Sequence, residues 1–152
     1  MIHIERLTPV DGEALTGLYR ELSGKTTDIE KMNHNLDWIS ANQDYFLIGA
    51  KDEKGNLLGS LMAIMGRDIV GSCRPFMVLE NVIVAEKYRG HGIGTQLYQW
   101  IEAIALHYNC YYIEFVSALE RKAAHRFYEK QGYKPGVVRG FKKYLPEKNS
   151  IR

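Results

Sequence analysis

The feature that most constrains the fold is an apolar run that leads, through a glycine-rich loop, into a helical pattern. Residues 75–86 are mostly apolar and include β-branched and aromatic side chains, and Glu80 and Asn81 are the only polar break inside the run. Such a run predicts a strand that is buried on both faces, near the middle of a sheet. Over residues 92–107, apolar side chains recur at helical spacing, which predicts a helix directly after the loop.

The loop itself is a candidate anion site. Its sequence, YRGHGIGT, contains three glycines, Gly90, Gly92 and Gly94. Backbone N–H groups at a helix start have no acceptor within the helix, and together with the helix dipole they favour a bound anion such as phosphate. Glycines let this group approach the backbone closely because they have no Cβ. The alternative is a tight turn that binds nothing.

The rest of the chain predicts a mixed α/β domain. Further strands are expected at residues 2–7, 45–52, 57–69, 111–117, 133–138 and 140–145. Further helices are expected from Asp11 to Gly24, from Ile29 to Ala41, and over residues 120–131. The prediction is therefore one domain over residues 1–146, with a mostly antiparallel sheet of about seven strands and about four helices, followed by a tail at 147–152.

Composition and charge exclude several classes of function. The 152 residues carry a formal net charge of +2 with no concentrated basic segment, which argues against nucleic-acid binding. No apolar stretch approaches the roughly 20 residues of a membrane helix, and the N-terminus lacks a secretory pattern, so we expect a cytoplasmic protein. Cys73 and Cys110 have no metal-ligand spacing, and we expect small buried side chains rather than a disulfide.

Two other nucleotide-binding motifs do not fit the glycine loop. A P-loop has a lysine after its last glycine, but Gly94 is followed by Thr95 and Gln96. The dinucleotide fingerprint G-x-G-x-x-G does not match glycines at every second position. Glu114 lies about 20 residues further on, where a ribose ligand is expected, but it falls inside a predicted strand and too little chain follows it. Dinucleotide binding is therefore only a distant alternative.

Two motifs of the chain carry a resemblance to a known family. Arg89, Gly92 and Gly94 follow the pattern of Arg or Gln, two residues, Gly, one residue, and Gly or Ala. Residues 123–133 read AAHRFYEKQGY, an alanine-rich turn followed by Phe-Tyr-Glu-Lys-x-Gly-Tyr. In this order, the motifs resemble those of the GNAT family of acetyl-CoA-dependent N-acetyltransferases, and the expected elements are similar to the whole family fold. Arg121 stands where many members have Asn, which bears on substrate class.

The resemblance implies a sheet that is splayed between two central strands, with acetyl-CoA bound in the opening. The pyrophosphate would lie on the amides of residues 89–94, and the pantetheine arm would run beside the backbone of residues 82–84 like an added strand. The implied cofactor-binding residues are Val82, Ile83, Val84, Arg89, Gly90, His91, Gly92, Ile93, Gly94 and Thr95. No metal is implied.

The resemblance also implies acetyl transfer to a primary amine by direct attack in a ternary complex. Glu80 is the candidate base, directly or through water; otherwise it is an exposed strand residue or a core carboxylate paired with an arginine. A backbone N–H near Val82 or Ile83 is the candidate oxyanion donor, at a strand bulge that the sequence does not locate. Tyr128 is the candidate acid for the leaving thiolate, and its alternative role is a packed helix aromatic.

The acceptor is not identified by the sequence. We expect it against residues 24–27, 68–74 and 136–140, and a small amine, an amino sugar or antibiotic, a polyamine and a protein amine all stay open. A non-catalytic acyl-CoA-binding sensor or interaction domain is the alternative function. The expected partners are acetyl-CoA and the amine acceptor, with a homodimer as an option, and neither nucleic acid nor a membrane.

Overall fold

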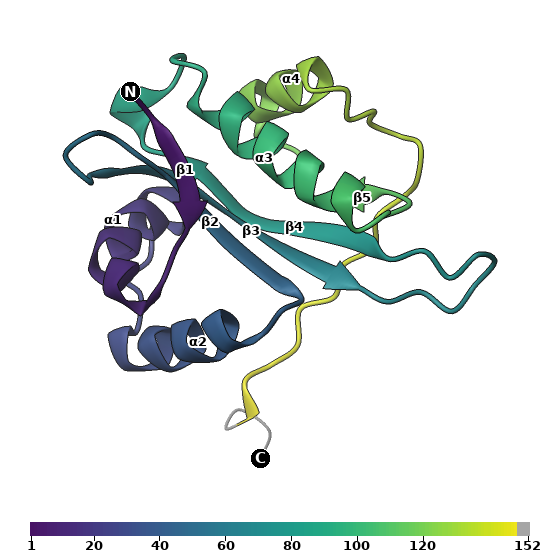
Figure 1. Ribbon diagram of the computed structural model, residues 1–152, viewed down its shortest axis with the longest axis horizontal. Coiled ribbons are helices and arrows are strands. Elements are labelled where there is room, and N and C mark those ends of the chain that lie inside the picture. The colour runs from purple at the N-terminus through teal and green to yellow at the C-terminus, as the bar shows by residue number, and fades with distance from the viewer. Residues whose placement is uncertain (149–152) are drawn as a thin grey trace. The chain divides into compact units, whose positions relative to one another are not determined.

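A five-stranded sheet forms the centre of the N-terminal part of the computed structural model (Figure 1). Its strands are β1 (His3–Arg6), β2 (Tyr45–Lys51), β3 (Leu57–Gly66), β4 (Phe76–Val84) and β5 (Ile113–Glu114), and they lie in the sheet in their order along the chain. The first four strands are antiparallel, and β5 is parallel to β4. The structure describes residues 1–148, which form two units, Met1–Phe115 and the residues from Val116 onward.

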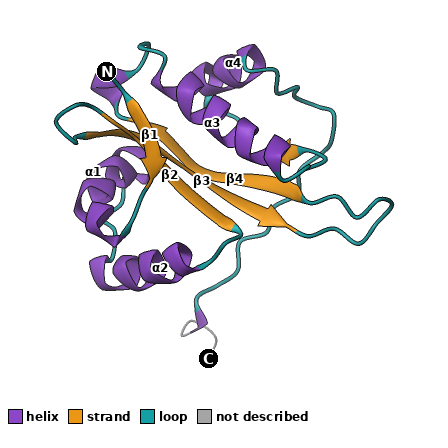
Figure 2. Ribbon diagram, in the orientation of Figure 1, coloured by secondary structure: helices purple, strands orange, loops and turns teal. Residues whose placement is uncertain are grey.

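Helices cover both faces of this sheet (Figure 2). α1 (Gly12–Ser23) and α2 (Ile29–Ala41) pack against one face, and α3 (Ile93–His107) packs against the other. Short 3-10 helices, η1 (Pro9–Asp11) and η2 (Glu86–Tyr88), precede α1 and α3. The core under α1 and α2 has the buried members Leu7, Leu15, Met32, Leu36 and Leu47. Within residues 1–148, no helix has both the length and the apolar content needed to cross a membrane.

The ends of α1 and α2 follow signals that are visible in the sequence. Gly24 ends α1 in the left-handed conformation, with φ of 70°, and its N–H donates to the Arg20 carbonyl over 2.8 Å. Asp28 caps α2 because its carboxylate accepts a hydrogen bond from the Lys31 N–H over 3.1 Å. Both predicted helices are therefore confirmed.

The C-terminal unit contains α4 (Lys122–Lys130), which confirms the helix predicted at residues 120–131. Gly132 follows it with φ of 91°, the left-handed end that its position after the helix predicts. Of the tail predicted from residue 147, residues 149–152 lie outside the described part of the chain.

The predicted fold class, a mixed α/β fold with a mostly antiparallel sheet, is confirmed, but residues 1–148 contain five strands and not about seven. Residues 133–138 and 140–145 form no strand. Their large apolar side chains are exposed, namely Val137, Val138, Phe141, Tyr144 and Leu145. A strand is stable only where a neighbouring strand exchanges backbone hydrogen bonds with it. Residues 116–148 contain no strand that could do so within the C-terminal unit, so β-propensity alone does not produce one.

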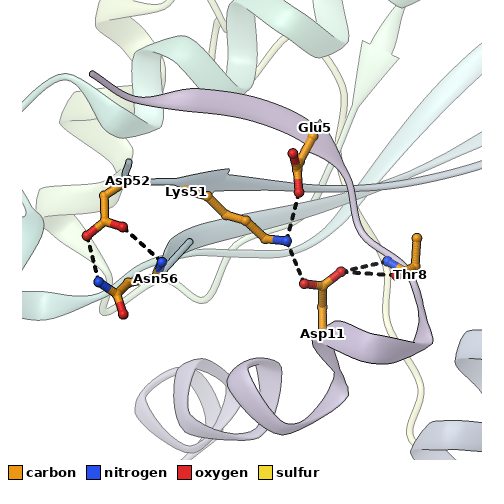
Figure 3. A network of polar contacts seen from close by, with 6 residues as sticks. All are labelled: Glu5, Thr8, Asp11, Lys51, Asp52 and Asn56. Carbon is orange, nitrogen blue, oxygen red and sulfur yellow. Dashed lines mark hydrogen bonds and ion pairs between the residues drawn. The ribbon is translucent and has the colours of Figure 1, made fainter. Parts of the chain in front are cut away.

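An ion-pair network joins β1, β2 and the start of α1 (Figure 3). Lys51 Nζ lies 2.7 Å from Glu5 Oε1 and 2.6 Å from Asp11 Oδ1. The second carboxylate oxygen of Asp11 accepts a hydrogen bond from the Thr8 N–H over 2.8 Å. Burial by itself would raise the pKa of Asp11, but the hydrogen bonds from Lys51 and Thr8 outweigh burial and hold this pKa below its usual value.

Replacing Asp11 by Asn should lower the free energy of unfolding by about 1–3 kcal/mol at neutral pH, the usual contribution of charge-assisted hydrogen bonds. Because the folded-state pKa is lowered, the Asp11 contribution is present above the unfolded pKa of about 3.9 and is lost as pH falls through the folded value. Urea unfolding from about pH 7 to about pH 2 should therefore show wild type and variant converging at acid pH.

Glu5 provides the control for this prediction because its side chain is half exposed, whereas that of Asp11 is 9% exposed. Glu5→Gln should lower the free energy of unfolding by less than about 1 kcal/mol. A loss in Asp11→Asn that does not change with pH would contradict an ionic role for Asp11.

Candidate active site

β4 contains a bulge at the polar break in its apolar sequence. Ser60 pairs with Ile83, and Met62 pairs with Glu80. The two β3 residues are two positions apart in the sequence, whereas their β4 partners are three apart, so β4 holds one extra residue. Asn81 has no register partner on β3 and adopts a left-handed φ of 52°. Asn tolerates this conformation better than most residues because its short polar side chain bonds locally. The structure thus locates the bulge that the sequence left unplaced.

The edge of β4 that faces β5 is paired only at its start. β5 is two residues long and pairs with Met77 and Val78, so the strand predicted at 111–117 is shorter than expected. Beyond Val78, β4 has no β5 partner among the residues that the structure describes. An unpaired strand edge offers N–H and C=O groups to an extended ligand. Pairing between β4 and β5 over only two residues agrees with the predicted opening between these strands.

Glu80 lies beside the bulge with an exposed side chain. Its register partner Met62 packs on the core cluster beneath α1 and α2, and directly opposed residues lie on the same face of a sheet. Glu80 therefore lies on the face that α1 and α2 cover. Within residues 1–148 it has no ion-pair partner. The exposed side chain of Glu80 does not fit a core carboxylate paired with an arginine. The two roles that stay open for Glu80 are a catalytic base and an exposed strand residue.

The glycine loop links η2 to the first turn of α3. Gly90 and Gly92 have φ of 78° and 77°, which bulky residues rarely adopt, and Gly94 lies inside α3. A Cβ added at Gly90 or Gly92 would meet no heavy atom within 4 Å, so space is open next to both glycines. The candidate anion site at the start of α3 is therefore built from backbone groups with free access.

Two side chains hold this loop in place. Arg89 Nε donates to the Val84 carbonyl over 3.0 Å, and the Arg89 N–H donates to the Glu86 carbonyl over 3.2 Å. His91 Nδ1 lies 2.9 Å from the Arg89 carbonyl and 3.2 Å from the Tyr88 carbonyl. Because carbonyl oxygens only accept, Nδ1 must carry the proton. The Arg89 N–H already donates to the Glu86 carbonyl. The amides that could bind an anion are therefore those from residue 90 onward.

A cavity of about 320 Å³ lies on the face that α1 and α2 cover. Leu47 and Met62 line it from the sheet, and Asn81 lines it from the bulge. The other lining residues belong to α1, α2 and the loop between them, and they are Tyr19, Thr27, Asp28, Lys31, Met32, Asn35, Leu36 and Ile39. Of the segments predicted to contact the acceptor, 24–27 contributes Thr27, and 68–74 contributes nothing to this cavity. The sequence did not indicate the part of the lining that comes from α2, because the apolar side chains of α2 have the helical spacing of ordinary core residues.

Two groups of the cavity lining, the Tyr19 phenol and the Asp28 carboxylate, keep their usual protonation states at neutral pH. Burial raises the pKa of the Tyr19 phenol, and the nearby Ser60 hydroxyl opposes this shift without reaching hydrogen-bond geometry. The Tyr19 hydroxyl therefore stays protonated and can donate. The Lys31 N–H and then its ammonium lower the pKa of Asp28, which keeps that carboxylate ionised. Lys31 Nζ lies 3.3 Å from Asp28 Oδ2, so the two charges offset each other.

Tyr128, the candidate acid, lies on α4 in the C-terminal unit. Its side chain is 9% exposed, and its ring packs edge-on against Phe127 at 5.8 Å between centroids. His125 lies on the same helix, with its Nε2 3.2 Å from Ser117 Oγ. Tyr128 is thus both a packed aromatic and a residue with a hydroxyl, and its catalytic role stays a prediction.

Comparison with known proteins gives a family and a fold. The model of the acetyltransferase (GNAT) family matches residues 13–133. The curated aminoalkylphosphonate N-acetyltransferase of Salmonella typhimurium is 36% identical over 61 residues. This match covers 40% of the present chain and 40% of the relative, so it spans less than half of that protein.

Two solved structures share the fold along most of their length. Glucosamine-6-phosphate N-acetyltransferase from Arabidopsis thaliana superposes with a TM-score of 0.81 at 19% identity, covering 95% of this chain and 99% of that chain. A transcriptional regulator from Bacillus halodurans C-125 superposes with a TM-score of 0.87 at 22% identity, covering 95% and 100%. At such identities the likeness concerns the fold alone.

Replacing Gly92 by Val should weaken CoA binding severely, because a β-branched residue resists a φ of 77° and its side chain would occupy the space next to the amides. Gly55→Val is the matched control, since Gly55 has φ of 81° and equally open surroundings in the β2–β3 turn. Both variants should lose about 1–2 kcal/mol of stability to backbone strain. Calorimetric titration with CoA should detect weaker binding in Gly92→Val only, and equal affinities in the two variants would contradict the anion site.

Proposed function

The chain belongs to the acetyltransferase (GNAT) family, and we propose that it transfers the acetyl group of acetyl-CoA to a primary amine by direct attack, with both substrates bound together. The observation that carries this proposal is the order of three features along the chain. The bulge at Asn81, the open edge of β4 and the glycine loop before α3 follow one another within residues 79–94. A thioester with a long amide arm and a pyrophosphate matches such a series of groups.

The backbone of this segment can hold acetyl-CoA. The amides from Gly90 to Thr95 would bind the pyrophosphate, aided by the positive end of the α3 dipole. Residues Val82–Val84 would pair with the pantetheine amides along the open edge of β4. Arg89 would support this arrangement by fixing the Val84 carbonyl and the loop together. When bound, acetyl-CoA supplies the activated acyl group.

Glu80 would take the proton of the acceptor amine. An alkylammonium group has a pKa of about 10.4 in water, so its proton must be removed near neutral pH before the nitrogen can attack. The exposed carboxylate of Glu80 lacks an ion-pair partner within residues 1–148 and lies on the face of the cavity-lining Met62. It is therefore available to accept this proton, directly or through water.

The bulge would provide the donor for the developing oxyanion. Val82, like Asn81, has no register partner on β3, whereas Ile83 lies opposite Ser60. A residue outside the ladder can turn its N–H away from the neighbouring strand. Of the two amides predicted for this role, that of Val82 is thus the better candidate. A preorganised N–H of this kind stabilises negative charge on a carbonyl oxygen.

Tyr128 would give its hydroxyl proton to the leaving thiolate. A phenol with a pKa of about 10 is protonated at neutral pH and can donate. The family motif at residues 123–133 supports this role. Release of free thiol from acetyl-CoA, measured across a panel of amines, tests the whole proposal. CoA binding without amine-dependent thiol release would favour the acyl-CoA sensor instead.

Glu80→Gln should lower the rate of acetyl transfer most at low pH, because a base matters most when the amine is largely protonated. A pH–rate profile for thiol release should therefore show a steeper acid limb in the variant. Glu114→Gln is the control, since Glu114 is also an exposed glutamate and lies on the neighbouring strand β5. A Glu80→Gln profile that overlays that of wild type would remove Glu80 from catalysis.

Tyr128→Phe should lower kcat by about 10²–10⁴-fold, the usual contribution of a positioned general acid, while the affinity for acetyl-CoA changes much less. The substitution keeps the ring and most of its buried area, so the apolar packing of the ring is retained. Tyr144→Phe, at a side chain that is exposed, is the matched control. An unchanged kcat with an acceptor for which chemistry limits the rate would refute the acid role, and a large loss of stability would favour a packing role.

A further inference from the structure

We infer that the acceptor is a small primary monoamine with an apolar body, and that this body occupies the cavity between α1, α2 and the β4 bulge. The inference rests on the proposed acetyl transfer and specifies its second substrate. The two family motifs, at residues 89–94 and 123–133, contribute no residue to the lining of this cavity.

The floor of the cavity is apolar. Met62 and Leu47 on the sheet face Met32, Leu36 and Ile39 on α2, and each of these five side chains is buried or partly buried. A volume of about 320 Å³ lies at the lower end of the range of small-molecule pockets, so the cavity has room for an acceptor with a ring or an alkyl body. Burial of such a group is favourable by about 25 cal/mol per Å². The floor therefore selects an apolar body rather than a polar one.

The charges at the rim exclude two other acceptor classes. A polyamine or an aminoglycoside needs several carboxylates, but among residues 1–148 Asp28 is the only acidic residue in the lining, and it already pairs with Lys31 at 3.3 Å. A phosphonate needs an unmatched cation, but within the same described residues Lys31 is the only basic residue in the lining. The Lys31 side chain is 84% exposed and its ammonium is paired with Asp28, so solvent screens its charge and its attraction for a phosphonate is weak. The cavity is thus close to neutral and suits an amine with no second charge.

The pairing of β3 with β4 places the apolar floor of the cavity next to Glu80, the proposed base. Met62 lies in the floor and directly opposite Glu80, and opposed residues of an antiparallel pair have Cβ atoms about 4.5–5.5 Å apart. Asn81, the next residue, lines the cavity from the bulge. An amine whose body rests on Met62 would therefore present its nitrogen to Glu80 and to the Asn81 carboxamide. This orientation would place the nucleophile at the open edge of β4.

Steady-state thiol release with four amines tests the inference. They are 2-phenylethylamine, ethanolamine, spermidine and 2-aminoethylphosphonate, each with acetyl-CoA at saturation. We expect kcat/KM for 2-phenylethylamine to exceed that for each of the others by about tenfold or more, because the apolar floor rewards its ring. A higher kcat/KM for spermidine, ethanolamine or the phosphonate would overturn the inference and leave the acetyl transfer intact. No acetylation of any amine would count against the proposed function itself.

Three variants test whether the cavity lining sets the choice of acceptor. Met62→Gln should lower the preference for 2-phenylethylamine over ethanolamine by about tenfold. Ile64→Gln makes a similar change two residues along β3, at a partly buried side chain outside the cavity lining, and should keep the preference. Asn35→Asp adds a carboxylate at the exposed rim, where the fold tolerates it, and should raise the relative kcat/KM for spermidine. Thermal unfolding should confirm that Met62→Gln is folded. An unchanged preference for 2-phenylethylamine in this variant would contradict the assigned cavity. An unchanged relative kcat/KM for spermidine in Asn35→Asp would also contradict it.

Discussion

The left-handed backbone at Asn81 is the constraint on which the site depends. In a regular strand, residues three apart lie on opposite faces, but the extra residue at the bulge places both Glu80 and Ile83 on the face of α1 and α2. Ile83 is buried there with Leu18 and Ala85. Positive φ costs a non-glycine residue roughly 1–2 kcal/mol, and burying an isoleucine contributes about 1.5–3 kcal/mol. Packing of Ile83 can therefore offset the backbone strain at Asn81.

The same bulge divides β4 into two parts with different tasks. Before it, Met77 and Leu79 are buried, and the strand is paired on both sides at Met77 and Val78. After it, the side towards β5 has no strand partner within the described residues, and the chain soon turns into η2 and the glycine loop. The first part anchors the strand in the sheet, and the second offers its backbone to a ligand. A single strand can do both because the bulge interrupts its ladder with β3 at Asn81 and Val82.

The cavity proposed for the acceptor depends on how α1 and α2 are held against the sheet. Lys51 bridges Glu5 and Asp11, and in this way fixes β1, β2 and the start of α1 relative to one another. Gly24 and Asp28 end one helix and begin the next. The cavity lies between these helices and the bulge, with apolar side chains below and one compensated ion pair at its rim. Stability and the proposed choice of acceptor thus depend on the same face of the sheet.

The sequence by itself determined the elements whose signals are local. Apolar spacing, Asp28 as a cap and Gly24 as a stop predict α1 and α2, and the run before the glycine loop predicts β4 and α3, because these patterns act over a few residues. The polar break marked Glu80 as unusual. Only the tertiary structure decided the rest. The bulge position depends on pairing between β3 and β4, and the cavity joins side chains from α1, α2 and three strands. The last two predicted strands failed for the same reason, since strand formation requires a partner from elsewhere in the chain and sequence propensity does not supply one.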